Sequence, residues 1–123
     1  MRSLGSYRGI PLQDLLVETV EWPDEIANYI RSRSERRKGE VDIEPEWATE
    51  AALDAVRLVG VRTDPKTGRE SLSLTVVGYS PAAAEVLAVW LRPKNLEAGD
   101  WYGQNTARAR RQWRREYMDR RQA

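Results

Sequence analysis

Two basic residues, Arg92 and Lys94, follow an apolar hairpin that spans residues 70–91. The end of a strand beside a loop is a common position for residues that bind phosphate. Arg57 and Arg69 would add a second basic cluster if both lie on one face of the same sheet. The alternative for each of these residues is an ordinary surface charge.

The C-terminal segment is the most basic part of the chain. Seven arginines lie between Arg108 and Arg121, against only Glu116 and Asp119. Such a density of positive charge predicts contact with nucleic acid or with an acidic partner. The arginines expected to contact RNA are Arg108, Arg111, Arg114 and Arg115. The alternative is a solvated helix whose charge is balanced by the acidic segment 40–54, which has six acids and no bases.

Aromatic residues offer stacking surface or hydroxyl groups. Trp101 lies among turn-forming residues, so it could be presented by a loop to RNA, or it could fill the base of the last helix. Asn105 or Thr106 could then cap that helix. Tyr79 could offer a hydroxyl group, although a tyrosine at a strand end more often serves packing.

Several chemistries are excluded by composition. The chain has 123 residues, a net charge of +1, no histidine and no cysteine. Mechanisms that use a Ser–His or Cys–His pair are therefore excluded, and a zinc site would need carboxylates alone. The alternating acids of segment 40–46 do not match a calcium loop. No metal or cofactor is expected, and no apolar run of membrane-spanning length or export signal is present, so we expect a cytoplasmic protein.

Hydrophobic periodicity predicts the elements that position these residues. Residues 72–76 alternate apolar and polar side chains as in a half-buried strand, and residues 86–91 are continuously apolar. Gly78 between them predicts a bulge or the close approach of another backbone. The expected elements are strands at 17–22, 57–63, 69–79 and 86–91, helices at 23–39, 46–53 and 104–120, and a loop at 93–103.

The order of these elements, β-α-α-β-β-β-α, predicts an α+β fold with helices packed on a small, mostly antiparallel sheet. Residues 1–16 are expected to form an N-terminal arm that packs on the body or on a partner, and residues 17–121 a single domain. Trp113 and Tyr117, four residues apart, should anchor the last helix on the sheet.

The chain resembles the BrnT-like toxins of bacterial type II toxin–antitoxin systems, whose fold is similar to that of RelE. Four segments carry the resemblance between Val17 and Tyr117. They are Val20-Glu21-Trp22-Pro23-Asp24-Glu25, Gly39-Glu40-Val41 with Glu50-Ala51, Gly78-Tyr79-Ser80 with Val86-Leu87-Ala88-Val89, and Asn105-Thr106 with Ala109, Arg114 or Arg115, and Tyr117. Lys38 stands where the family usually has a histidine, and the family's arginine before the central glycine has no clear counterpart.

The resemblance implies a metal-independent endoribonuclease that is held by a cognate antitoxin and forms homo- or hetero-oligomers. The RNA 2′-hydroxyl would attack its own phosphate, which needs a base, an acid and a cationic stabiliser. The residues implied for phosphate stabilisation are Arg69, Arg92 and Lys94, those for proton transfer are Tyr79 and Tyr117, and Glu70 is the implied base. The alternative is a non-catalytic module that binds nucleic acid or protein through its basic C-terminal helix.

Overall fold

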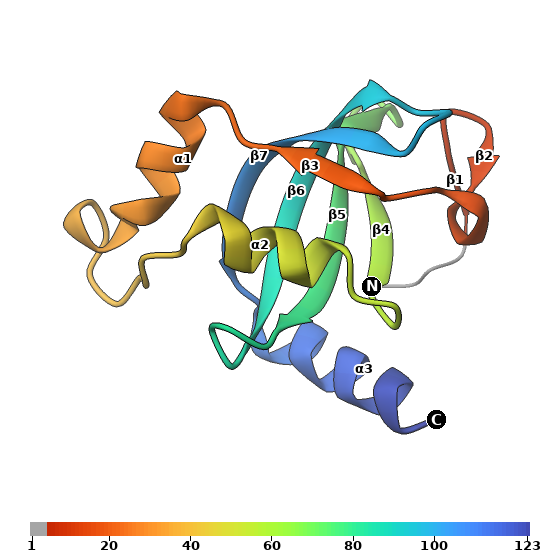
Figure 1. The fold of residues 1–123 in the computed structure, drawn as a ribbon. Helices are drawn as coiled ribbons and strands as arrows, with labels where there is room; N and C mark the ends of the chain where they lie inside the picture. The colour runs from red at the N-terminus through yellow and green to blue at the C-terminus, as the bar shows by residue number, and fades with distance from the viewer. Residues whose placement is uncertain (1–4) are drawn as a thin grey trace.

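The structure is a computed structural model that describes residues 5–123. It has an α+β fold with one five-stranded mixed sheet, ordered β3-β7-β6-β5-β4, and a separate two-stranded hairpin. Figure 1 shows the sheet with α2 across its front and α3 at its lower end. The strands are β1 (Ser6–Tyr7), β2 (Ile10–Pro11), β3 (Thr19–Glu21), β4 (Leu58–Thr63), β5 (Glu70–Ser80), β6 (Glu85–Asn95) and β7 (Asp100–Arg108). The helices are α1 (Asp24–Arg31), α2 (Pro45–Ala52) and α3 (Arg111–Gln122), with 3₁₀ turns η1 (Leu12–Asp14) and η2 (Arg33–Glu35).

Strands β4 to β7 form an antiparallel meander, and β3 closes one edge by pairing in parallel with β7. The expectation of a mostly antiparallel sheet therefore describes three of its four pairings. The parallel strand reaches its neighbour through two helices and three other strands, as a parallel connection requires a long crossover.

The expectations for residues 93–120 are partly wrong. Instead of a long loop, β6 continues to Asn95 and the chain turns within four residues into β7. The predicted start of the last helix at Gln104 lies inside β7, and α3 begins at Arg111. Residues 100–108 carry only one β-branched side chain, so their strand forms because β6 and β3 offer partners on both sides.

The two faces of the sheet bury different clusters. Val76 of β5 and Val89 of β6 pack under α2, whereas their neighbours Val77 and Ala88 pack under α3. Successive side chains of a strand point to opposite faces, which explains the division. Tyr117 is buried against this second face beside the half-buried Trp113, which confirms the predicted anchors of the last helix.

The first helix is shorter than expected. It ends at Arg31, and η2 follows in place of further α-helical turns. Ile30 is fully buried as predicted, but Tyr29, expected on the same stripe, is 42% exposed. No helix between residues 5 and 123 is both long and apolar enough to cross a membrane.

Residues 5–16 of the expected N-terminal arm pack on the body, while residues 1–4 lie outside the described part of the chain. Tyr7, Leu12 and Leu15 are buried in the cluster under α2. The Tyr7 ring lies 5.7 Å from the ring of Trp101, and its hydroxyl donates a hydrogen bond of 2.9 Å to the carbonyl of Leu72. The hairpin β1–β2 therefore shares one core with the sheet.

Gly78 marks the close approach of a second backbone, which is one of the two alternatives that its position in the sequence predicts. A Cβ atom on this residue would lie 1.9 Å from the carbonyl oxygen of Ala51, near the end of α2. The absence of a side chain thus lets α2 rest directly on β5.

We expect Gly78→Ala to destabilise the protein by about 3 kcal/mol or more, because a methyl group here forces α2 away from the sheet. Gly39→Ala is the matched control, since that residue has a φ of +88° but nothing within 4 Å of an added Cβ. The control should lose about 1–2 kcal/mol. Denaturant unfolding monitored by tryptophan fluorescence measures both, and equal losses would contradict the close packing.

Candidate nucleic-acid interface

α3 covers only one end of its face of the sheet, and the remainder is the candidate site. Pairing places Thr75, Trp90 and Asn105 in one row across β5, β6 and β7. Two residues further along β6, Arg92 pairs with Tyr102 on the same face. We call the surface formed by Thr75, Trp90, Arg92, Tyr102, Gln104 and Asn105 the open face.

A β-bulge brings two neighbouring amides to the open face. Trp90 pairs with Asn105 but Leu91 pairs with Gly103, so Gln104 is an extra residue in β7. In a regular strand Gln104 and Asn105 would point to opposite faces. Here both line the same cavity, because a bulge re-aims side chains locally.

Three adjoining cavities follow the open face. The first and second share Ile26 and Gln104, and the second and third share Trp90. Their volumes are about 690, 490 and 240 Å³. None of the described residues that line these three cavities is aspartate or glutamate.

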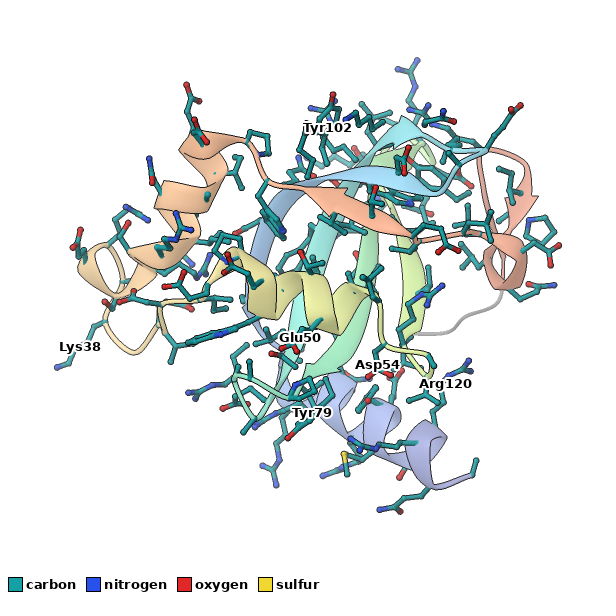
Figure 2. All side chains as sticks on the ribbon, in the orientation of Figure 1. Lys38, Glu50, Asp54, Tyr79, Tyr102 and Arg120 are labelled. Atoms are coloured by element: carbon teal, nitrogen blue, oxygen red, sulfur yellow. The ribbon has the colours of Figure 1, made fainter. Side chains whose placement is uncertain are left out.

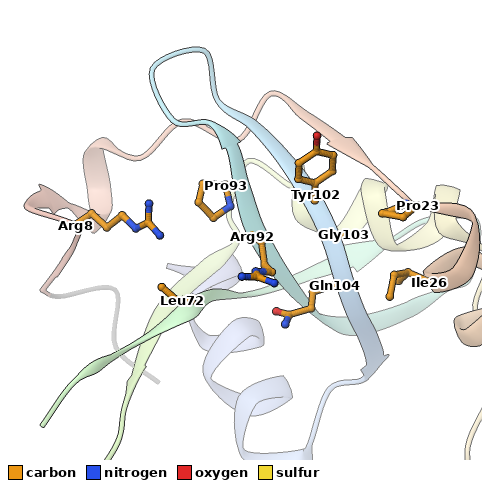
Figure 3. Close-up of a pocket in the computed structure, with 9 residues that line it drawn as sticks. All are labelled: Arg8, Pro23, Ile26, Leu72, Arg92, Pro93, Tyr102, Gly103 and Gln104. Atoms are coloured by element: carbon orange, nitrogen blue, oxygen red, sulfur yellow. The ribbon is translucent and has the colours of Figure 1, made fainter. Parts of the chain in front are cut away.

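The first cavity is basic and lies at the end of the sheet farthest from α3. Figure 3 shows Arg92 at its centre, with Arg8 from the turn between β1 and β2 on one side and Tyr102 and Gln104 of β7 on the other. Two arginines without a lining carboxylate suit a phosphate group, which a guanidinium binds through two parallel hydrogen bonds.

The second cavity contains aromatic and amide groups, and a buried arginine lies behind it. Tyr29, Trp90, Gln104 and Asn105 contribute to its wall. Arg33 of η2 donates a 3.0 Å hydrogen bond from Nη1 to Oδ1 of Asn105. The Tyr29 ring is contacted in turn by the guanidinium of Arg36, 4.1 Å from its centroid.

The third cavity carries two tryptophans and two arginines. The rings of Trp90 and Trp113 lie 6.4 Å apart, and the guanidinium of Arg110 stacks 4.2 Å from the Trp113 ring. Arg62 of β4 and Thr75 complete the wall. Aromatic rings beside guanidinium groups can stack bases of a single strand.

The six residues proposed for catalysis lie at two opposite ends of the sheet and cannot form one site. Glu70 and Tyr79 are nine residues apart along β5, which corresponds to about 30 Å. Figure 2 shows Tyr79 beside Glu50 and Asp54 at the lower end, and Tyr102 at the upper end. Arg69, Arg92 and Lys94 belong to the Glu70 end, and Tyr117 to the Tyr79 end.

At the Tyr79 end the tyrosines have structural partners. The Tyr117 hydroxyl donates to a carboxylate oxygen of Asp54, which also accepts a 2.9 Å bond from the backbone N–H of Tyr79. Burial, followed by the bond to Asp54 and its charge, raises the pKa of Tyr117 to about 12. A phenol with this pKa is a poor proton donor near neutral pH. The Tyr79 ring is covered by the guanidinium of Arg121 at 5.1 Å.

At the Glu70 end the cations remain accessible. Lys94 forms an exposed 3.3 Å ion pair with Glu21, and the hydrogen bond to that carboxylate raises the pKa of Lys94. Its ammonium group therefore stays protonated and cannot act as a base at neutral pH. Arg69 and Glu70 line a separate cavity beside the β4–β5 turn. Burial raises the pKa of Tyr7, and the positive charges of Arg8 and Arg92 oppose this shift.

Trp101, expected to contact RNA, is fully buried, and its Nε1 donates to the carbonyl of Leu16 at 2.9 Å. It therefore has no exposed ring for a base. Arg108 ends β7 and pairs with Glu85 at 3.2 Å instead of lying on the last helix. Arg111, Arg114 and Arg115 lie on α3 and are exposed.

The acidic segment 40–54 bonds mainly to groups outside α3. Glu40 pairs with Arg33 and Glu44 with Arg31, while the N–H and hydroxyl of Ser34 bind Asp42 and lower the pKa of its carboxyl group. Asp54, at the end of this segment, bonds to Tyr117 of α3. Within residues 5–123, no group of three or more acidic side chains could hold a metal ion.

Most of the open face is not predictable from the sequence. Arg8, Tyr29, Arg33, Trp90, Tyr102, Gln104 and Asn105 were not among the expected site residues. The polar pair Gln104-Asn105 is the available signal, but the sequence predicts the start of the last helix there. Strand register and a bulge, which depend on distant partners, place these residues on one face.

We expect Tyr117→Phe to lower the free energy of unfolding by about 2 kcal/mol at pH 7, because the bond to a charged acceptor is lost. A phenol whose pKa is raised stabilises the fold fully below pH 10, and this contribution disappears as the pH approaches 12. The difference in the free energy of unfolding between wild type and Tyr117→Phe should thus shrink by on the order of 2 kcal/mol between pH 10 and pH 12. Chemical denaturation at several pH values measures it, with Tyr29→Phe as the control. A constant gap would contradict the Asp54–Tyr117 bond.

The three cavities, their arginines and the bulged amides thus form a continuous surface with the residue types of a nucleic-acid interface. Comparison with protein families, curated proteins and solved structures finds no match to this chain. The function is therefore argued from the geometry of the open face.

Proposed function

We propose that the protein is a toxin-like, metal-independent endoribonuclease whose single-stranded RNA substrate lies along the open face of the sheet. The observation that carries this proposal is the chain of three adjoining cavities lined by arginine, aromatic and amide side chains. The resemblance of residues 17–117 to BrnT-like toxins, whose fold is similar to that of RelE, supports the same class.

A single strand suits this face better than a duplex. Unpaired bases can enter cavities and stack on rings that line them, such as the exposed Tyr29 and the half-buried Trp90, whereas a duplex hides its bases. Arginines at both ends of the row, Arg92 and Arg110, can contact successive phosphates. The 2′-hydroxyl needed for cleavage without a metal is present only in RNA.

Cleavage is assigned to the basic cavity around Arg92. The RNA 2′-hydroxyl attacks the adjacent phosphorus and gives its proton to water, the bond from phosphorus to the 5′-oxygen of the next nucleotide breaks, and that oxygen takes up a proton. Arg92, assisted by Arg8, stabilises the charge on the phosphoryl oxygens. Tyr102 lines this cavity together with Arg92, whereas Tyr79 and Tyr117 do not. Lys94, which contacts the Tyr102 ring at 5.5 Å, can supply a proton to the leaving oxygen. No described carboxylate lines this cavity, and Glu70, the base implied by the resemblance, lines a separate cavity beside the β4–β5 turn, so the proton of the 2′-hydroxyl passes to water.

A cognate antitoxin in the cytoplasm remains the proposed partner. The exposed arginines of α3 offer it a positive surface next to the open face. Expression of this protein alone should then slow bacterial growth, and co-expression of the antitoxin should restore it.

A binding module without cleavage is the second candidate. It is favoured by the lack of a carboxylate among the residues that line the three cavities and by the engagement of Tyr117 with Asp54. Purified protein that binds single-stranded RNA but leaves it intact would support this candidate over the nuclease.

We expect Arg92→Gln to slow RNA cleavage by about 100-fold, because one preorganised cation at the reacting phosphate is removed. Arg37→Gln is the matched control, since it removes the same charge from an exposed residue that lines none of the three cavities. Its rate should stay within about twofold of wild type. Single-turnover cleavage of a labelled single-stranded RNA measures both, and equal rates for the two variants would contradict the assignment.

Salt dependence separates the open face from α3 as the RNA site. For a single strand, each phosphate contact makes the slope of log affinity against log salt more negative by about 0.7. We expect Arg92→Gln to make this slope less steep by about 0.7. The double variant Arg114→Gln with Arg115→Gln should leave the slope nearly unchanged. If the slope becomes less steep by about 1.4 in the double variant and does not change in Arg92→Gln, RNA binds on α3 instead. Fluorescence anisotropy over a salt series measures the slopes.

A further inference from the structure

We infer that the cavity lined by Gln104 and Asn105 reads one base of the bound strand and prefers the keto bases, guanine and uracil, over adenine and cytosine. This inference rests on the proposed binding of RNA along the open face. Four observations carry it: the fixed orientation of one amide, a buried arginine behind it, the bulge and the aromatic walls.

The orientation of the Asn105 amide is determined by its partners. Its Oδ1 accepts hydrogen bonds from Nη1 of Arg33 at 3.0 Å and from the backbone N–H of Thr106 at 2.8 Å. Both partners can only donate, so the oxygen must face them. The NH₂ group is thereby directed away from them, and no acceptor in the described part of the chain binds it.

Arg33 holds this orientation from behind the cavity. It is only 9% exposed and pairs with Glu40 at 3.2 Å through Nη2. Its Nε is buried and has no hydrogen-bond partner among the described residues. A buried donor without a partner costs stability, so packing alone does not explain the residue. Arg33 is a positioning residue that acts through Asn105.

The bulge adds a second amide to the same wall. The carbonyl oxygen of Gln104 accepts a hydrogen bond from the hydroxyl of Ser73, which lies on β5, the strand next to β6. With this oxygen engaged, the NH₂ group of Gln104 is left as a donor beside that of Asn105. The cavity therefore offers donors from two adjacent residues to a ligand.

Two donors distinguish bases by their edges. An amide usually recognises adenine through both its oxygen and its nitrogen, but the Asn105 oxygen already accepts two hydrogen bonds and the Gln104 oxygen accepts one from Ser73. The carbonyl oxygen of guanine or uracil can accept from these amides. The amino group of adenine or cytosine would face them donor to donor, which leaves both groups unpaired.

Affinity and selectivity come from different residues in this cavity. Tyr29 and Trp90 offer aromatic surface, and stacking on such rings tolerates every base. The volume of about 490 Å³ falls within the range of small-ligand sites. Selectivity then depends on the amides, and changing them should alter base preference more than total affinity.

The test compares four single-stranded oligonucleotides of about eight nucleotides, a length that spans a typical binding site. Their sugars are 2′-O-methylated, which blocks the nucleophile so that only binding is measured. Uridine and cytidine strands differ by keto against amino at position 4 and by the proton on the neighbouring ring nitrogen N3, and inosine and adenosine strands differ in the same way at position 6 and N1. We expect fluorescence anisotropy to show about tenfold tighter binding of the uridine and inosine strands.

Asn105→Asp replaces the donor by an acceptor while the carboxylate still accepts from Arg33 and Thr106, so the preference should reverse toward cytidine and adenosine. Asn28→Asp, an exposed residue outside the cavity, controls for the added charge and should keep the wild-type preference. The comparison of strands with wild-type protein stands even if the first variant does not fold.

Equal binding of all four strands by wild type, or a preference for amino bases, would overturn the inference and leave RNA binding in place. A failure to bind any strand would instead overturn the proposed function. An unchanged preference in a folded Asn105→Asp variant would assign the selectivity to other residues and so overturn the role of this amide.

Discussion

The direct contact between the end of α2 and Gly78 is the constraint on which the rest of the structure depends. Only a residue without a side chain allows the Ala51 carbonyl to approach β5 so closely. Asp54, just past α2, then reaches the backbone N–H groups of Val56 and Tyr79 and the hydroxyl of Tyr117. One carboxylate thereby connects both α2 and α3 to the same end of the sheet. Hydrogen bonds to a charged group are stronger than those between neutral groups.

This concentration of contacts at one end leaves the other end of the α3 face free for function. Thr75, Trp90 and Asn105 continue the row of strand residues beyond the helix, but cavities lie over them instead of a packed layer. A polar, bulged sheet surface with a partly unsatisfied buried arginine does not improve the fold. Such departures from local rules are expected at functional sites.

The sequence predicts the elements with strong local patterns and misses those that depend on partners. The alternation of residues 72–76, the proline that begins α2 and the i, i+4 pair Trp113 and Tyr117 are all visible in a short window. Strand β7 has no such pattern because its polar residues pair with β3 and β6 from distant parts of the chain. For the same reason, the catalytic residues expected from the sequence come from opposite ends of β5, and Gln104 and Asn105 at the bulge are not among the expected site residues.

The parallel pairing of β3 with β7 has a consequence for biosynthesis. Thr19 is made about eighty residues before its partner Asp100, so the edge strand cannot dock until β7 has been made. Contacts of such long sequence separation form slowly, because the chain loses the entropy of loop closure before the contact stabilises it. The surface proposed to bind RNA draws on β5, β6 and β7, and hence it too forms only after β7 has been made. A nascent chain that has not reached β7 therefore has no assembled binding surface.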